Sequence, residues 1–430
     1  MNQHPIKTML WVWGLCVVGY VFLPFQLLQR QLTLYGVVIL VLFFAAFILG
    51  ALLVPSRTSE IRLKSRLIDA ARAETCLVSA SILATIFFFL DAKGRNLFDL
   101  VMAYQLRSES ADALLNAGDS DSSLWFQMAF VLYPAAYVYI AVHSMYASRV
   151  QPWKIFLFGF LPVILATLIM GGRVPILYAA VVAWLALRER KKLRQPDCLP
   201  AKPVSAHSWK LRAVWLAVAA VLLYYFSTVF MVRAAVAGGA AEMFLLAEER
   251  WGVGFNGPMS GLIFSIFGEE LTYLIFIFSW YLVQGLVMSN YIFTAYEGPL
   301  QLGIYGADII SALMRRIEPQ RVAEGFGELL NLGTYGFLPS AWGSLYVDFG
   351  FGGLFFCVMW GAFAAWCYRC IVVQQKTNWF LLGPFVTMGM IFSTMNTPLG
   401  FTNGLVTYSW LLLAFLLLKH GRQPDGMVAK

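Results

Sequence analysis

Ten long apolar runs constrain the fold of this chain more than any other feature. They occupy residues 8–28, 33–54, 76–90, 124–146, 155–170, 174–187, 213–230, 344–367, 379–395 and 402–418. Runs of this length span a bilayer as α-helices, the shorter ones with a few flanking residues, because about 20 residues rising 1.5 Å each cross a hydrocarbon core of roughly 30 Å. Each run is therefore a candidate membrane crossing.

The composition favours a membrane protein and excludes several other classes. Hydrophobic residues make up 60% of the 430 residues, and charged residues only 13%. That ratio excludes a soluble enzyme with one globular core, a disulfide-linked secreted domain, a disordered chain and a nucleic-acid-binding protein. The sequence predicts one integral membrane domain over residues 1–430, all α-helical, with 10 to 12 membrane segments.

The charged residues between the runs predict which loops share a side of the membrane. With the N-terminus inside, the inside segments hold 21 basic and 6 acidic residues, whereas the outside segments hold 10 basic and 17 acidic residues. Cytoplasmic loops of membrane proteins carry the excess of Lys and Arg. We therefore expect both termini in the cytoplasm, because the reverse orientation would invert this pattern.

One further apolar segment, 271–293, does not fit as an eleventh crossing. As a single crossing it would put the acidic residues of 297–328 inside and reverse the charge pattern downstream. We expect a re-entrant or interfacial segment, or one half of a paired crossing with 258–267. Irregular backbone at membrane depth is tolerated only against protein or beside a watery cavity, so a substrate groove is expected near this segment.

Polar residues concentrate in a first outside loop, 91–123, and in a long outside region, 231–343. Nine of the ten outside basic residues are arginines, whereas the inside set includes ten lysines. Arginine binds phosphate oxygens through a planar fork and keeps its proton. This bias indicates an anionic ligand. The alternative is that these arginines are ordinary ion-pair partners of the outside acids.

Arg173 is the most informative of these arginines. It follows Gly171 and Gly172 in a tight turn between two apolar runs, so its guanidinium is expected at the outer interface, where glycines let a ligand approach closely. Arg233, just beyond the seventh run, is expected at the same depth. Together the two arginines suit a lipid-linked diphosphate. The alternative is that Arg173 snorkels and caps a helical hairpin.

A second charged stretch of the outside region contains further candidates. Arg315 and Arg316 precede Pro319, which interrupts any helix there. Glu324 and Glu328 then lie four residues apart, on one face of the piece that follows. The alternative is a plain solvated segment of mixed charge.

Asp348, at the mouth of the eighth run, is the strongest candidate for a general base. At that depth it needs an arginine or a ligand hydroxyl as partner. Asp119 and Asp121 have the spacing of a divalent-metal motif, but two acids in a Ser-rich loop are more often simply solvated. No histidine lies in an outside loop under this topology, and no nucleotide-binding, metalloprotease or serine hydrolase motif is present. No metal and no cofactor is therefore expected.

Together these features resemble the oligosaccharide repeat unit polymerases of bacterial envelopes (O-antigen polymerase, Wzy-type). The resemblance covers roughly residues 120–418 in arrangement. Its motifs are Gly171-Gly172-Arg173 in the tight turn, Arg233, the apolar segment with Tyr281 and Tyr291, and the stretch Tyr346-Val347-Asp348-Phe349-Gly350 with Gly352 and Gly353 entering the next run.

The resemblance implies a C-type glycosyltransferase-like fold in the bacterial inner membrane and a metal-independent polymerase. Such an enzyme transfers the growing glycan from undecaprenyl diphosphate to the next lipid-linked repeat at the outer face, and a separate chain-length regulator is an expected partner. Under this resemblance Arg173 and Arg233 hold one diphosphate, and Arg315 and Arg316 hold the other. Asp348 or Glu328 acts as the base. The expected sugar-stacking residues are Tyr281, Tyr335, Trp342 and Tyr346.

Two other functions stay open at this point. An O-antigen ligase, which moves finished glycan onto the lipid A core, shares the fold but carries a histidine in an outside loop, which this chain lacks. A lipid-linked oligosaccharide flippase or another transporter generally places polar residues near the membrane midplane. Here the charges cluster at one face, which favours an enzyme.

Overall fold

The computed structural model describes residues 4–22, 26–55, 68–93, 101–102, 123–193, 207–255 and 260–420. Each of the ten predicted runs contains a helix, and the chain has the build of an all-α polytopic membrane protein. The longer helices are α1 (Pro5–Phe22), α2 (Leu34–Leu53), α3 (Ala71–Asp91), α9 (Val174–Leu193), α10 (His207–Val236), α12 (Ser260–Ala295), α16 (Gly353–Tyr368) and α18 (Gly404–Leu417).

Shorter elements extend or connect these helices. Pro134 separates α5 (Leu124–Leu132) from α6 (Ala135–Tyr146), and a π-helical turn, η1 (Ile155–Phe160), joins α7 (Pro152–Lys154) to α8 (Leu161–Ile169). The remaining helical elements are α11 (Ala240–Leu246), η2 (Ala247–Trp251), α13 (Asp308–Ile317), α14 (Pro319–Asn331), α15 (Ser340–Phe349), η3 (Gly350–Gly352), η4 (Arg369–Val373), η5 (Thr377–Leu381), α17 (Leu382–Ile391) and η6 (Phe392–Thr394). The strands are β1 (Gln26–Leu27), β2 (Ile68–Asp69), β3 (Val253–Gly254) and β4 (Lys419–His420).

Within the described part of the chain, eight helical segments are long and apolar enough to cross a membrane, one of which is α12. Three predicted crossings are not among them: α9, α17 and α18. Two predicted boundaries were wrong. The first run ends as a helix at Phe22, and residues 26–27 form a strand instead. The run 344–367 divides at Gly350, whose φ of +56° ends α15 before α16 begins.

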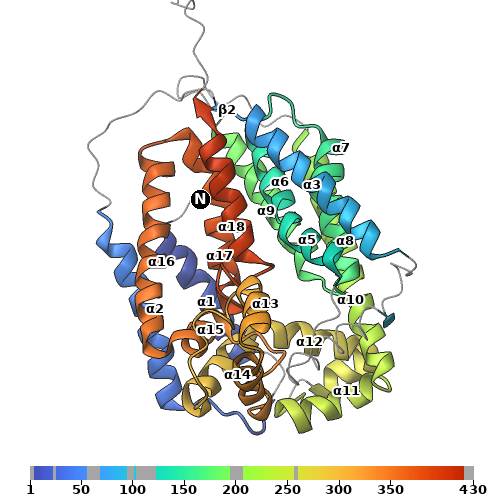
Figure 1. Ribbon diagram of the computed structural model, residues 1–430. Coiled ribbons are helices and arrows are strands. Elements are labelled where there is room, and N and C mark those ends of the chain that lie inside the picture. The colour runs from blue at the N-terminus through green and yellow to red at the C-terminus, as the bar shows by residue number, and fades with distance from the viewer. Residues whose placement is uncertain are drawn as a thin grey trace, which may run out of the picture.

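The loops that the charge pattern predicts to lie outside gather at one end of the helix bundle, at the bottom of Figure 1. We call this end, formed by residues 26–33, 170–173, 237–255 and 296–339, the loop end. There β1 pairs with β3 in an antiparallel two-stranded sheet. Arg30 donates to the carbonyl oxygen of Gly333 at 2.8 Å. These contacts join segments that are more than 200 residues apart in sequence.

The segments predicted to lie inside gather at the opposite end, which we call the basic end. There β2 pairs with β4. The guanidinium of Arg190 donates to the carbonyl oxygen of Ala147 at 2.8 Å, and the Tyr146 hydroxyl donates to that of Thr377 at 2.9 Å. Two independent sets of contacts therefore reproduce the two-sided arrangement that the charges predicted.

Helix α12 crosses the loop end instead of running along the bundle (Figure 1). Its Tyr281 contacts Arg173. Further along the helix, the Oδ1 of Asn290 accepts the backbone N–H of Thr33, at the start of α2, at 2.9 Å. The helix is kinked at Gly268, where φ is +70°, between the segments 258–267 and 271–293. This arrangement agrees with the interfacial alternative for 271–293, although α12 also qualifies as a crossing by length and composition.

The bundle is closed on one side by a close contact between α2 and α16. A Cβ on Gly50 would lie 1.9 Å from the carbonyl oxygen of Val358, and one on Gly361 would lie 2.0 Å from that of Phe47. Only glycine allows this backbone approach. The contact fixes α16 and, through the turn at Gly350, the position of α15 at the loop end.

The last two helices are joined by a buried polar loop. Helix α17 has 10 residues and is only about 15 Å long, about half the thickness of a bilayer core. The polar side chains that follow are buried: Ser393, Thr397 and Asn403 are no more than 6% exposed. Ser393 Oγ accepts from the Trp13 indole at 3.0 Å, and Asn403 donates to the Phe130 carbonyl at 2.8 Å. Protein groups from α1 and α5 thus bind two of the buried polar side chains of this loop.

Candidate functional site

Arg173 lies in the turn between α8 and α9, at the loop end. Gly171 makes this turn with a φ of +56°. The Arg173 side chain is only 8% exposed. Its Nη2 donates to the hydroxyl oxygen of Tyr281 on α12 at 2.6 Å, and its guanidinium carbon lies 3.7 Å from the centre of the Phe230 ring on α10. Two aromatic side chains therefore hold the guanidinium in place.

Arg173 is a buried cation without a carboxylate partner among the described residues. The ion pairs in that part of the chain include His143–Glu74, Lys192–Glu189 and Arg321–Glu318, and Arg173 belongs to none of them. The Nη1 atom of Arg173 is buried and makes no hydrogen bond there. Burying an unpaired charge and an unused donor is unfavourable, so an anion that accepts from Nη1 would be bound favourably. Nη1 is thus a donor without an acceptor in this arrangement, and a ligand could bind it only after the groups that cover it move.

Helix α10 holds the same turn from the other side. Arg233 Nη2 donates to the carbonyl oxygen of Gly171 at 3.3 Å, and the Tyr225 hydroxyl donates to that of Gly172 at 3.1 Å. The structure therefore brings Arg173, Arg233 and Tyr281 together, and we call this group the arginine site. Sequence reasoning missed Tyr225 and Phe230. They lie about two turns and one turn before Arg233 on the same helix, and this spacing was the available signal.

Asp348 lies in α15 and binds protein backbone, contrary to the expectation that it needs an arginine or a ligand hydroxyl. It is 2% exposed. Its two oxygens accept the backbone N–H groups of Tyr305 at 3.0 Å and Gly306 at 2.8 Å. A Cβ on Gly306 would lie 2.5 Å from Oδ2. Asp348 therefore fixes the loop that leads to α13, and at 2% exposure its carboxylate is not accessible to a substrate hydroxyl in this arrangement.

Glu328 lies on α14 near Asp348, in a group of tyrosines. Its side chain is half-buried, and no hydrogen bond or ion pair joins it to another described side chain. Burial, together with the nearby carboxylates of Asp348 and Glu328, raises the pKa of Tyr296 to about 12. Burial also raises the pKa of Tyr305 well above its usual value. Of the two predicted bases, Glu328 is thus the one with a free carboxylate.

The two groups of candidate residues lie at different positions along α12. Tyr281 contacts the arginine site, whereas Ile292 and Tyr296 pack in the cluster with Leu329 and Tyr335. Fifteen residues of helix separate Tyr281 from the start of the next loop at Tyr296, or about 22 Å. Arg173 and Glu328 therefore belong to two different groups of contacts along α12.

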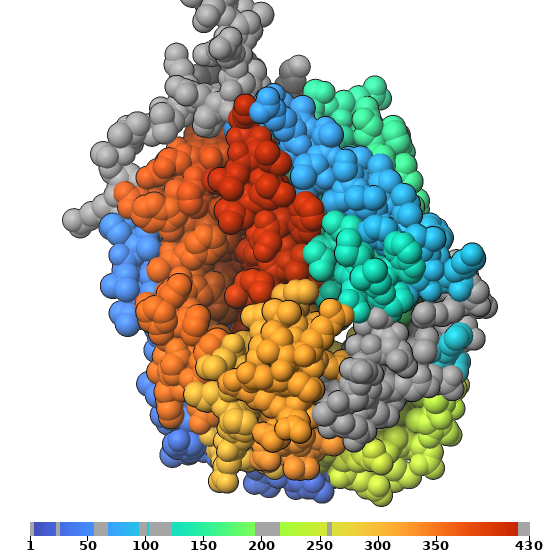
Figure 2. Space-filling view, viewed as in Figure 1, coloured from blue at the N-terminus to red at the C-terminus, as the bar shows by residue number. Residues whose placement is uncertain are grey.

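Arg315 and Arg316 lie in the last turn of α13. Helices α13 and α14 cover the loop end beside α5 and the start of α18 (Figure 2). Arg316 donates to the side-chain oxygen of Gln127 on α5, whereas Arg173 contacts α10 and α12. The predicted second diphosphate site is thus at the loop end but separate from the arginine site.

The predicted sugar-stacking residues have different environments. Trp342 is fully buried and stacks on Trp13, with ring centres 5.9 Å apart. The expectation that it presents a face to sugar is wrong, because it fills the core between α1 and α2. Tyr346 is half-buried against Phe293, at 5.1 Å. Tyr335 packs edge-on against Phe326 at 5.9 Å.

Arg30 is one of the nine outside arginines whose abundance indicated an anionic ligand. In the structure, however, it binds backbone carbonyls. Besides Gly333, it donates to the carbonyl oxygen of Leu332 at 3.2 Å and to the sulfur of Met288 at 3.3 Å. Burial lowers the pKa of its guanidinium below the usual value. Its role is to join the loop after α1 to the turn after α14.

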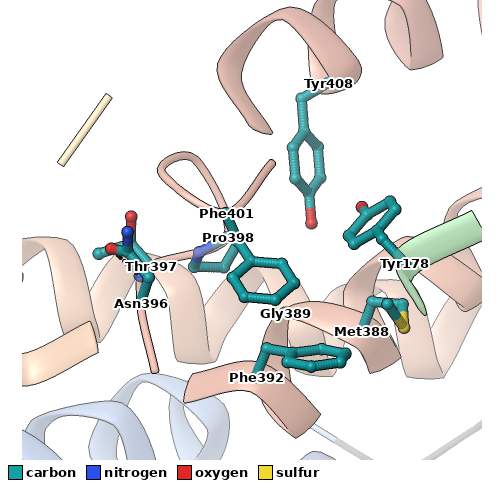
Figure 3. Close-up of a pocket in the computed structure, with 9 residues that line it drawn as sticks. All are labelled: Tyr178, Met388, Gly389, Phe392, Asn396, Thr397, Pro398, Phe401 and Tyr408. Atoms are coloured by element: carbon teal, nitrogen blue, oxygen red, sulfur yellow. Dashed lines mark hydrogen bonds between the residues drawn. The ribbon is translucent and has the colours of Figure 1, made fainter. Parts of the chain in front are cut away.

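A small cavity lies away from both groups, between α9, α17 and α18. The Tyr408 hydroxyl points into it between the rings of Tyr178 and Phe401 (Figure 3). Its volume is about 10 Å³, about the space of one water molecule. It is too small for a substrate. The D-x-D pair Asp119 and Asp121 and most of loop 91–123 lie outside the described residues.

Comparison with protein-family models gave no match, and comparisons with curated proteins and with solved structures gave none either. The function therefore has to be argued from the site itself.

Proposed function

We propose that this chain polymerises lipid-linked oligosaccharide repeat units, for an O-antigen or a related envelope polysaccharide. It would transfer the growing glycan from undecaprenyl diphosphate to the next lipid-linked repeat at the outer face of the bacterial inner membrane. The loop end would face outward and the basic end the cytoplasm, as the positive-inside rule requires. The fold would be that of a C-type glycosyltransferase, with no metal and no cofactor.

One observation carries this proposal: the buried guanidinium of Arg173, with an unused Nη1 donor and without a carboxylate partner among the described residues. It lies at one end of a bundle of apolar helices, beside a second arginine, Arg233. Preorganised guanidiniums bind diphosphate through short, charge-assisted hydrogen bonds. At the donor, guanidiniums would also stabilise the charge that develops on the diphosphate leaving group.

The reaction follows from these groups. A hydroxyl oxygen at the non-reducing end of the acceptor repeat attacks the anomeric carbon of the donor glycan. The bond from that carbon to the diphosphate oxygen breaks, and undecaprenyl diphosphate leaves with the bonding electrons. The proton of the hydroxyl passes to a carboxylate, for which Glu328 has the free oxygens.

The two groups of contacts along α12, one with Arg173 and one beside Glu328, support separate places for the two substrates. We assign the arginine site to the diphosphate of the acceptor, whose attacking hydroxyl lies one repeat unit away, near Glu328. Arg315 and Arg316 would then hold the diphosphate of the donor. Tyr281 and Tyr335 lie at either end of this path, where the sugars would pass.

Deletion of the gene tests the proposal against its alternatives. A polymerase deletion leaves single lipid-linked repeats on the outer face. A flippase deletion traps them inside, and a ligase deletion leaves long glycan on the undecaprenyl lipid.

Complementation with Arg173→Ala or Arg233→Ala should give short glycan only. Arg321→Ala, which removes an exposed ion pair with Glu318, should restore long glycan. Long glycan with both Arg173→Ala and Arg233→Ala would reject the proposal.

A further inference from the structure

From Leu216 on, where its burial is described, helix α10 packs closely against the protein only near its loop end. Val229, Phe230 and Ala234 are buried, whereas no residue of 216–224 is. Only 11% of the residues in its most apolar window are buried, against 28% to 67% in the other seven candidate crossings. The helix therefore diverges from its neighbours as it leaves the loop end.

One face of α10 is nevertheless half-covered along its length. Val218, Leu222, Tyr225, Val229 and Arg233 lie within about 80° of one another on a helix of about 100° per residue. The first three are half-buried, and Val229 is 5% exposed. Over residues 216–224 the remaining faces point outward, as the exposures of 71% at Leu216, 56% at Leu223 and 75% at Tyr224 show. Burial on the half-covered face is greatest at Val229, near the loop end, and we call this face the apolar wedge.

The arginine site lies at the loop end of this wedge. Tyr225 and Arg233, on the same face, hold the Gly171-Gly172 turn, and Phe230 stacks under Arg173. Leu222 lies eleven residues from Arg233, or about 16 Å, which is about half of a hydrocarbon core of 30 Å. The wedge thus leads from an anion-binding group to the middle of the apolar layer.

We infer that this face of α10 binds the isoprenoid chain of a polyprenyl diphosphate whose head group lies at Arg173 and Arg233. The inference rests on the proposed function and adds where the carrier lipid lies. The head group of a glycosylated polyprenyl diphosphate has two negative charges, which match two guanidiniums, whereas a phosphodiester lipid has one. A single chain also fits along one helix face.

A pair of neighbouring leucines allows a matched test. Leu222 lies on the half-covered face, and Leu223 is exposed on another. Each is replaced in turn by the photo-crosslinking residue p-benzoylphenylalanine, and the purified full chain is placed in phosphatidylglycerol nanodiscs with radiolabelled undecaprenyl diphosphate. Labelling should occur predominantly at position 222, and it should be lost when Arg173→Ala is combined with that replacement.

Equal labelling at the two positions, or labelling at 222 that persists with Arg173→Ala, would identify ordinary boundary lipid and overturn the inference. If Arg173→Ala does not yield folded protein, Leu222→Trp and Leu223→Trp replace it. The first should weaken binding of undecaprenyl diphosphate about tenfold by filling the wedge, and the second should not. No difference between them would also overturn the inference.

The crosslinking experiment and the gene deletion can fail independently, so the lipid site and the proposed function are tested separately. Labelling at position 222 in a protein whose gene deletion leaves glycan length unchanged would retain the lipid site and reject the polymerase. Loss of long glycan on deletion, without preference for position 222, would retain the polymerase and reject the lipid site.

Discussion

The Nη2 of Arg173 donates to the hydroxyl oxygen of Tyr281 at 2.6 Å, across 108 residues of sequence. This bond joins the turn between α8 and α9 to the helix that crosses the loop end. The ring of Tyr281 also lies 5.2 Å from the guanidinium carbon. Tyr281 thus orients Arg173 through its hydroxyl and its ring, which makes it a positioning residue for the arginine site.

Tyr281→Phe removes the hydroxyl and keeps the ring. A hydrogen bond to a charged group contributes about 1.5–3 kcal/mol, so binding of undecaprenyl diphosphate should weaken by about tenfold or more. The midpoint of thermal unfolding in detergent should also fall, because this bond is already present in the protein without ligand. Tyr224→Phe, which removes an exposed hydroxyl, is the control. Unchanged binding in Tyr281→Phe would mean that the ring alone positions Arg173.

Tyr225→Phe tests the other support of the same turn. Its hydroxyl donates to the Gly172 carbonyl at 3.1 Å, a neutral hydrogen bond worth about 1 kcal/mol. We expect a small loss of unfolding free energy and a weaker affinity for undecaprenyl diphosphate, both measured beside Tyr224→Phe. An affinity equal to that of the control would show that Arg233 holds the turn alone.

Much of the fold follows from the sequence because its physical causes are local. Each apolar run becomes a helix since the bilayer requires satisfied backbone groups, and the excess of Lys and Arg on one set of loops predicts which loops share an end. The polar loop between α17 and α18 was not predicted. Ser393 looks like an isolated polar residue in an apolar run and Thr397 like part of a loop, and only the structure shows that α1 covers the first and that the second bonds to the Gly306 carbonyl.

The site was predicted in part. Arg173 and Arg233 could be paired because the short turn and the helix end set their depth. Asp348 and Trp342 were misjudged because a single sequence does not show partners: backbone N–H groups at Tyr305 and Gly306 satisfy the carboxylate, and α1 covers the indole. Such contacts between distant segments leave no periodic signal.

Glu328→Gln tests the proposed base. The substitution keeps the shape of the side chain and removes its proton acceptor, which should lower the polymerisation rate about 100-fold or more. Folded yield should stay unchanged, since the carboxylate makes no hydrogen bond or ion pair with another described side chain. Glu324→Gln, exposed one turn earlier on α14, is the control. Long glycan in a strain with Glu328→Gln would remove Glu328 from the mechanism.

Asp348→Asn should affect folding more than chemistry. The new amide brings N–H donors against the N–H groups of Tyr305 and Gly306, which leaves at least one buried group unsatisfied and lowers the free energy of unfolding by about 1–3 kcal/mol. Thermal unfolding in detergent measures this loss, with the exposed Glu270→Gln as control. Normal stability together with a complete loss of long glycan would instead restore Asp348 as the base.

The last prediction concerns the helix pair that positions α15. Gly50→Ala would place a methyl group 1.9 Å from the Val358 carbonyl oxygen, so α2 and α16 would have to separate. Overpacking of this kind lowers stability by about 1–3 kcal/mol. Gly14→Ala on α1 adds the same methyl group where nothing lies within 4 Å. We expect a lower unfolding midpoint and shorter glycan for Gly50→Ala, and wild-type behaviour for Gly14→Ala. Equal midpoints would mean that α2 and α16 do not approach so closely, and the position inferred for α15 and Asp348 would then have to be revised.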